Sequence, residues 1–149
     1  AKLVMAGGSS FSDTYVQSLE RLRGGDERIK MVGYVYGDVL EELWSNAYLV
    51  AQPSILEGLS IALIEALSFG RCVIASDIPE NIEVVEDSAI TFKSRDVQDL
   101  RSKLQMCLDH PDMVTATASR CRTLAEEKYS WPRLVEATER VYEKAVNGR

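Results

Sequence analysis

Short apolar runs alternate with helical patterns along the first two thirds of the chain. Turn residues bound the runs, which lie at 2–6, 29–32, 47–51, 71–75 and 89–92. Continuous apolar runs of this length are typical of strands that are buried on both faces of a parallel sheet. The alternation predicts right-handed β-α-β units and therefore an α/β fold, with a doubly wound, mainly parallel, Rossmann-like sheet and flanking helices.

From residue 96 onward the pattern is helical only. An apolar stripe predicts a helix over 96–109, and a second helix is expected to extend to about Lys128. A third helix is expected to begin at Ser130, because serine is a good N-cap residue and a proline follows in the first turn. We expect Trp131 to anchor this helix by packing. No repeat or linker divides the sequence, so residues 1–149 are expected to form one domain with a helical C-terminal segment.

Composition and charge exclude several classes of function. The chain has 149 residues, of which 46% are hydrophobic and 27% charged, as in a soluble globular domain. Its formal charge of −6 argues against nucleic acid as a partner. Three cysteines without CxxC spacing indicate reduced thiols and a cytoplasmic location, and with one histidine they predict no metal site. No run approaches the ~18 apolar residues of a membrane helix.

Two glutamates are the most informative residues for chemistry. The segment 59–69 (LSIALIEALSF) is apolar almost all round, and such a helix is normally buried on every side. Glu65 lies inside it and therefore needs a fixed partner or a cleft, because an unpaired buried charge is strongly disfavoured. Glu57 precedes the helix, next to Gly58, where free N–H groups and the positive end of the helix dipole attract anions.

The spacing of the glutamates fits a ligand in which a diphosphate joins a sugar to the ribose of a nucleotide. Ligands of open α/β sheets bind at the carboxyl ends of the strands. Glu65 is expected about 10 Å along the helix, comparable to the reach from a sugar to a ribose across a diphosphate. Simpler interpretations stay open at this point, since Glu57 could be a solvated loop acid and Glu65 could pair with Ser68 or a neighbouring arginine.

A set of motifs in fixed order resembles one enzyme family. Over essentially its whole length the chain is similar to the C-terminal domain of the retaining glycosyltransferases of family four, which have the two-domain GT-B fold. The motifs are the strand ending in Gly7-Gly8, Val32-Gly33-Tyr34-Val35, Pro53-Ser54, Glu57-Gly58-Leu59-Ser60, Glu65-Ala66-Leu67, Phe69-Gly70, Val73-Ile74-Ala75-Ser76-Asp77, Glu83-Val84-Val85-Glu86-Asp87 and Tyr129-Ser130-Trp131.

The resemblance assigns roles to these residues. It implies that Glu57 is the catalytic residue and contacts the hydroxyls of the donor sugar. Glu65 would bind the ribose of the nucleotide, and the N–H groups of Leu59 and Ser60 would hold the distal phosphate. The remaining residues expected to bind the donor are Gly58, Gly7, Gly8, Gly33, Tyr34 and Val35.

The same resemblance implies transfer of a sugar from a nucleoside-diphosphate sugar with retention at the anomeric carbon, without a metal or other cofactor. The family's arginine and lysine pair precedes Gly7-Gly8, and its acceptor-binding N-terminal domain lies further upstream; this chain begins too late to contain either. We therefore expect an isolated domain that is inactive alone, binds its donor weakly and needs the missing N-terminal domain as a partner. Peripheral association of the full-length protein with a membrane is left open.

Three alternatives come from other classes. One is a non-catalytic relative that binds a nucleotide sugar or acts as a scaffold. Another is a GT-B nucleotide-sugar epimerase, for which the sequence supplies no additional base. A nicotinamide-dependent dehydrogenase is disfavoured, because the first strand lacks the three-glycine fingerprint.

Overall fold

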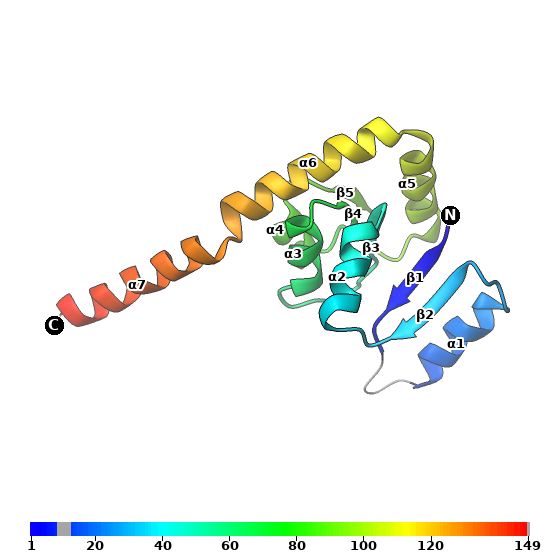
Figure 1. The fold of residues 1–149 in the computed structure, drawn as a ribbon, viewed down its shortest axis with the longest axis horizontal. Helices are drawn as coiled ribbons and strands as arrows, with labels where there is room; N and C mark the ends of the chain where they lie inside the picture. Colours follow the sequence, from blue (N-terminus) through cyan, green and yellow to red (C-terminus); the bar gives the residue numbers. More distant parts are fainter. Residues whose placement is uncertain (9–12, 149) are drawn as a thin grey trace. The chain divides into compact units, whose positions relative to one another are not determined.

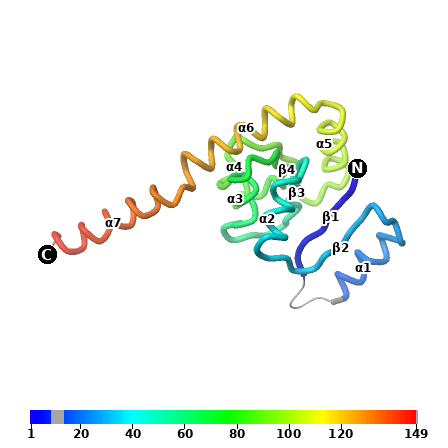
Figure 2. Tube along the Cα trace, in the orientation of Figure 1, coloured from blue at the N-terminus to red at the C-terminus, as the bar shows by residue number. Residues whose placement is uncertain are grey.

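The computed structural model describes residues 1–8 and 13–148, which form two compact units, Ala1–Leu43 and Trp44–Arg149. Every strand and helix discussed above is present, and the strand bounds lie within two residues of those expected (Figure 1). Figure 2 allows the chain to be followed from element to element. Each unit is described by itself.

The first unit is built around two parallel strands. β1 (Leu3–Ala6) pairs with β2 (Ile29–Gly33), and the register shifts between Met5 and Ala6. α1 (Asp13–Arg23) connects the two strands, as a parallel pairing requires, and α2 (Gly37–Asn46) begins after β2.

The second unit contains a three-stranded parallel sheet in the order β3-β4-β5. Its elements are β3 (Leu49–Gln52), α3 (Ile61–Ser68), β4 (Cys72–Ser76), α4 (Pro79–Val85), β5 (Ile90–Phe92), α5 (Val97–Asp109), α6 (Pro111–Lys128) and α7 (Trp131–Asn147). The three helices predicted for the C-terminal segment are thus confirmed. Asp96 caps α5 by accepting hydrogen bonds from the N–H groups of Gln98 and Asp99, both at 3.0 Å.

The α/β class with parallel pairing and flanking helices is confirmed. Within the first unit β1 pairs with β2, and within the second unit β3, β4 and β5 pair in that order. The apolar pattern of a segment predicts a strand, but it does not report which strands pair with each other. The expected single domain over residues 1–149 stays a prediction.

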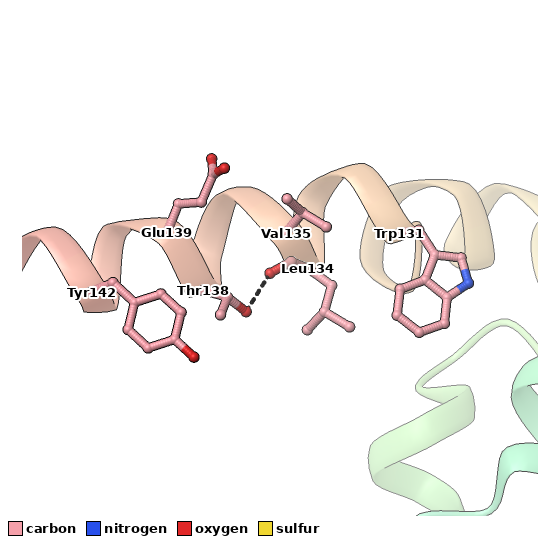
Figure 3. A pocket seen from close by; sticks show the side chains of 6 residues that line it. All are labelled: Trp131, Leu134, Val135, Thr138, Glu139 and Tyr142. Atoms are coloured by element: carbon pink, nitrogen blue, oxygen red, sulfur yellow. Dashed lines mark hydrogen bonds between the residues drawn. The ribbon is translucent and has the colours of Figure 1, made fainter.

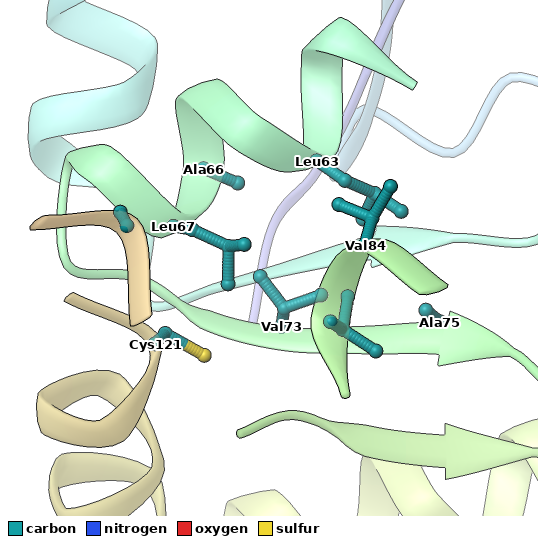
Figure 4. Close-up of a cluster of buried hydrophobic side chains, with 9 residues drawn as sticks. Leu63, Ala66, Leu67, Val73, Ala75, Val84 and Cys121 are labelled. Carbon is teal, nitrogen blue, oxygen red and sulfur yellow. The ribbon is translucent and has the colours of Figure 1, made fainter. Parts of the chain in front are cut away.

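β4 is the centre of the core in the second unit, because its residues are buried on both faces. Val73 and Ala75 pack with side chains of α3, α4 and α6, as Figure 4 shows. Cys72 and Ile74 point to the other face, where they pack with residues of β5, α5 and α6. This alternation is the period of two expected of a strand between two layers of helices.

α3 differs from the expectation in its burial and its start. Leu63, Ala66 and Leu67 are fully buried, but Ile61 is 58% exposed. The helix therefore has an exposed face and is not buried on every side. It begins two residues later than expected, because Ser60 is the N-cap and its hydroxyl accepts a hydrogen bond from the N–H of Leu63 at 3.4 Å.

The expectation that Trp131 anchors a packed helix is wrong. Trp131 is 77% exposed, and no described residue of α7 is buried. Instead, Trp131, Leu134, Val135 and Tyr142 lie along one face of α7 and line a shallow hollow there (Figure 3). A spacing of three and four residues brings side chains to one face of a helix, whether or not anything covers that face.

The three cysteines are free thiols in the core. Cys72, Cys107 and Cys121 are all fully buried, and none forms a disulfide. Burial is the largest cause that raises the pKa of Cys72, which reaches about 12. Burial also raises the pKa of the other two thiols. Because the thiolate is the reactive form, these groups are chemically inert in the folded protein at neutral pH.

Truncation of Leu63 should show how much the core around β4 contributes to stability. Leu63→Ala is expected to lower the free energy of unfolding by about 2–5 kcal/mol, because it leaves a cavity between α3 and β4. Ile61→Ala, on the exposed face of the same helix, is the matched control and should change it by less than about 1 kcal/mol. Urea unfolding measures both. Equal losses for the two variants would contradict the packing described.

The buried thiol of Cys72 predicts an alkaline loss of stability. Its pKa is about 12 in the folded protein against an ordinary 9.0, so above pH 9 the unfolded chain binds fewer protons than the folded one. The stabilisation from the neutral thiol is complete below about pH 9 and is lost progressively as the pH rises toward 12. Urea unfolding at several pH values should show a shallower decline for Cys72→Ala; identical slopes would count against it.

Candidate functional site

The carboxyl ends of β3 and β4 lie side by side, because the two strands are parallel and Gln52 is paired with Ala75. β3 ends at Gln52, and β4 ends one residue beyond Ala75, at Ser76. The loop that follows β3 carries Glu57 and leads into α3. This edge of the sheet is where ligands of parallel α/β sheets bind.

Glu57 is held by two side chains of its own loop and strand. Its Oε1 accepts hydrogen bonds from Nε2 of Gln52 at 2.8 Å and from Oγ of Ser54 at 2.5 Å. Nε2 of Gln52 also lies 3.0 Å from Oγ of Ser54. The side chain is half-buried. A freely solvated loop acid would lack these contacts, so that simpler interpretation of Glu57 is wrong.

A second group of polar side chains lies behind this loop. Oγ of Ser76 donates to the carbonyl oxygen of Ser54 at 2.5 Å. Nδ2 of Asn81, in α4, donates to Oγ of Ser76 at 2.9 Å and to its carbonyl oxygen at 3.2 Å. Ser76 and Asn81 are both buried. They connect the loop of Glu57 to the core of the unit.

The N-terminus of α3 follows Glu57 directly. Gly58 and Leu59 are exposed, and Ser60 is buried as the N-cap. The first turn of a helix leaves N–H groups without intrahelical acceptors, and the helix dipole adds positive potential there. The first turn of α3 contains no acidic residue that would neutralise this potential. The expected phosphate donors at Leu59 and Ser60 thus lie at an electropositive helix end.

Glu65 lies on the same side of α3 as Ile61 and Ser68, both of which are exposed. Glu65 itself is half-buried, and its carboxylate has no hydrogen bond or ion pair with the described part of the chain. The expected alternative, a bond with Ser68, is wrong, because Oγ of Ser68 donates to the carbonyl oxygen of Ile64 at 2.8 Å. Arg71 binds backbone carbonyl oxygens instead, those of Phe69 and Ala47.

The late start of α3 also shortens the helical part of the segment between the two acids. Glu65 lies four residues beyond Ile61, or about 6 Å along the helix axis, whereas the expected distance of about 10 Å counted helical rise from Gly58 onward. The distance from the helix N-terminus to Glu65 still lies within the reach of a diphosphate and a ribose.

The five other expected residues gather at the carboxyl end of the strands in the first unit. The N–H of Gly7 donates to the carbonyl oxygen of Gly33 at 2.7 Å, and both glycines have positive φ, 125° and 67°. Gly8 lies against Tyr34, since a Cβ at Gly8 would come within 2.5 Å of the Tyr34 ring. Val35 follows and is half-buried. The structure thus brings the candidate residues together as two groups, one in each unit.

The aromatic pair in the first unit is a surface feature. The rings of Tyr34 and Tyr36 stack on each other, with centroids 6.4 Å apart and an interplanar angle of 12°. Tyr34 is 57% exposed and Tyr36 more so. Stacked exposed rings offer a flat apolar surface and hydroxyl groups next to Gly8.

Sequence reasoning did not assign roles to Gln52, Ser54, Ser76 or Asn81. Ser54 and Ser76 fell within the motifs of the resemblance, but their contacts with each other and with Glu57 were not predicted. A usable signal existed, because Gln52 and Ser76 are polar residues at the last positions of two otherwise apolar strands.

The described residues contain no group of three histidine, cysteine, aspartate or glutamate side chains that could hold a metal ion. Within the same part of the chain, the helices are either too short or too polar to traverse a bilayer.

Comparison with known proteins identifies the family. A sequence profile described as "Glycosyl transferases group 1" matches residues 1–110. An uncharacterized glycosyltransferase of Methanocaldococcus jannaschii is 27% identical over 148 residues, which are 98% of this chain and 38% of that protein. An alpha-(1->4)-mannosyltransferase of Mycolicibacterium hassiacum is 31% identical over 110 residues, 72% of this chain and 27% of the relative. The chain thus spans about two fifths or less of the length of these relatives.

Solved structures of glycosyltransferases share the fold. A Rickettsia africae glycosyltransferase superposes with a TM-score of 0.88 at 15% identity, over 99% of this chain and 41% of that one. The Anabaena protein HepE, solved in complex with UDP-glucose, gives a TM-score of 0.83 at 20% identity, over 98% of this chain and 41% of HepE. Both the profile and the fold lead to one conclusion: the chain belongs to the group 1 glycosyltransferases and has the fold of the C-terminal domain of a GT-B enzyme.

Proposed function

We propose that this chain is the donor-binding part of a glycosyltransferase that transfers a sugar from a nucleoside-diphosphate sugar with retention at the anomeric carbon. One observation carries the proposal. The N-terminus of α3 lies between Glu57, a carboxylate that is held in place, and Glu65, a carboxylate without a partner among the described residues. A ligand with a sugar, a diphosphate and a ribose presents matching groups in that order.

Glu57 binds the hydroxyls of the donor sugar in this proposal. Gln52 and Ser54 both donate to Oε1, and this leaves Oε2 of the carboxylate without a partner in the described part of the chain. A carboxylate accepts several hydrogen bonds, so the remaining capacity of Glu57 suits sugar hydroxyls. Because the carboxylate of Glu57 is already held in one orientation, less side-chain entropy is lost when the sugar binds.

The N-terminus of α3 receives the diphosphate. The N–H groups of Leu59 and Ser60 donate to the distal phosphate, next to the positive end of the helix dipole. When the bond to the sugar breaks, negative charge develops on the leaving nucleoside diphosphate, and fixed donors stabilise that charge more than they stabilise the ground state. Gly58 lets the ligand approach the backbone, and no cofactor takes part.

Glu65 accepts hydrogen bonds from the ribose hydroxyls of the nucleotide. Its position on the exposed side of α3 makes it accessible, and its lack of a partner in the described structure leaves its oxygens available. Gly7, Gly8, Gly33, Tyr34 and Val35 of the first unit contact the nucleotide through exposed backbone and the Tyr34 ring.

The relatives support this assignment. They include the mannosyltransferase named above, and HepE has been solved with UDP and with UDP-glucose. Because the chain covers about two fifths of HepE, we place the acceptor site and the basic residues that grip the diphosphate in the remainder of a longer protein. The isolated chain then has no transferase activity and binds its donor weakly. We assign the full-length protein to the cytoplasm and leave peripheral association with a membrane open.

A titration tests the donor assignment. UDP, GDP and NAD are added separately, up to millimolar concentrations, to the ¹⁵N-labelled chain and followed by NMR. A nucleoside diphosphate should shift resonances of residues 57–65, and Glu65→Ala should weaken its binding about tenfold or more, because a charged hydrogen-bond acceptor is lost. Glu143→Ala, which removes an exposed glutamate of α7, is the matched control and should bind as the parent does.

Three results would contradict the assignment. Undiminished binding by Glu65→Ala would mean that Glu65 does not contact the ribose. Tighter binding of NAD than of UDP or GDP, or no binding of either diphosphate, would rule out a donor site for nucleoside-diphosphate sugars.

A further inference from the structure

Asn81 is a fully buried polar residue to which the proposed function gives no role. It lies in α4, and several contacts hold this helix in place. Val84 and Val85 are part of the core around β4. Nζ of Lys128 donates to the carbonyl oxygen of Glu83 at 2.9 Å. The side chain of Asn81 therefore starts from a well-fixed backbone.

The orientation of the Asn81 amide follows from its contacts. Nδ2 lies 3.2 Å from the carbonyl oxygen of Ser76, which can only accept a hydrogen bond. The amide nitrogen must therefore face Ser76, and it also donates to Oγ of Ser76 at 2.9 Å. Since Oγ accepts from Asn81, its own proton is free to go to the carbonyl oxygen of Ser54, 2.5 Å away.

These bonds continue to the proposed catalytic residue. Oγ of Ser54 donates to Oε1 of Glu57, and Gln52 donates to the same oxygen. A path of hydrogen bonds thus runs from α4 through the end of β4 to the loop after β3. It links Asn81 to a carboxylate 24 residues earlier in the chain.

The burial of the Asn81 amide has an energetic cost, and packing alone does not explain why a polar side chain occupies this position. Oδ1 of Asn81 is buried and has no hydrogen-bond partner in the described structure. A buried acceptor without a partner is unfavourable, and an apolar side chain of similar size would avoid that loss. The two donated bonds to Ser76 are what an apolar residue could not supply.

We propose that Asn81, acting through Ser76, is a positioning residue that fixes the loop of Ser54 and thereby orients Glu57 toward the donor sugar. The proposal rests on the proposed function of Glu57. It assigns no direct contact with the ligand to Asn81 or Ser76, because both are buried.

The first test needs no ligand. Ser76→Ala removes one oxygen atom and should leave the chain folded, whereas Asn81→Ala removes the whole amide. In ¹⁵N–¹H spectra both variants should shift the side-chain amide resonance of Gln52 and speed its hydrogen exchange, because the loop of Ser54 is released. Thr117→Ala is the matched control, since Thr117 is a fully buried polar residue of α6 outside the path.

The second test measures the contribution of the sugar to binding. The ratio of Kd for UDP to Kd for UDP-glucose, and the same ratio for GDP and GDP-mannose, isolates that contribution. In Ser76→Ala and Asn81→Ala this ratio should fall about fivefold to tenfold, the size expected for the loss of one ordinary hydrogen bond. Kd for UDP or GDP alone should stay unchanged. Ser76→Thr keeps the hydroxyl and should restore the ratio.

The outcomes separate this proposal from the proposed function. An unchanged Gln52 resonance in Ser76→Ala would overturn the positioning role. Equal weakening of UDP binding and UDP-glucose binding would also overturn it, because that result indicates general structural damage. If the parent chain bound no nucleotide or nucleotide sugar, the proposed function would be wrong and the role of Asn81 with it. A shifted Gln52 resonance would then still establish the path of hydrogen bonds.

Discussion

The burial of β4 on both faces is the constraint on which the second unit depends. All five residues from Cys72 to Ser76 are buried, so their backbone groups must be paired with protein rather than water, and β3 and β5 supply the partners. The odd and even side chains of β4 then pack into two separate core clusters, and α6 contributes to both. The same strand ends in Ser76, so the strand that organises the core also positions the candidate site.

Much of the fold could be predicted from the sequence, because apolar periodicity and capping residues report local structure well. The five strands and the last three helices were located within about two residues, and Asp96 caps α5 through its carboxylate. The pattern could not show which strands pair, since burial of a strand does not name its neighbour. It also overestimated burial at α3 and α7. Ile61 and Trp131 are apolar side chains that remain exposed, and hydrophobicity alone does not guarantee a covering surface.

The candidate site was predictable in part, for a similar reason. Glu57 and Glu65 stand out because a carboxylate next to or within an apolar helix is unusual, and that anomaly is local in sequence. The surroundings of Glu57 are not local. Ser76 meets the loop of Ser54 only because β3 and β4 are parallel neighbours in a particular register, and Asn81 meets Ser76 only because α4 folds back over the end of β4. Such contacts depend on tertiary packing, which no pattern along one strand or helix contains.

The exposed apolar side of α7 has a consequence for how the chain unfolds. No described residue of this helix is buried, so its helical state gains almost nothing from the core and relies on intrinsic propensity and local contacts such as the ion pair between Arg140 and Glu136. An isolated helix of this length is only marginally stable in water. α7 therefore forms a separate cooperative unit of low stability, whose backbone amides exchange with solvent well before those of α3 and β4. Helical content and the integrity of the core are consequently separate properties in this protein and need separate measurements. A loss of circular dichroism signal at moderate temperature reports a loss of helical content.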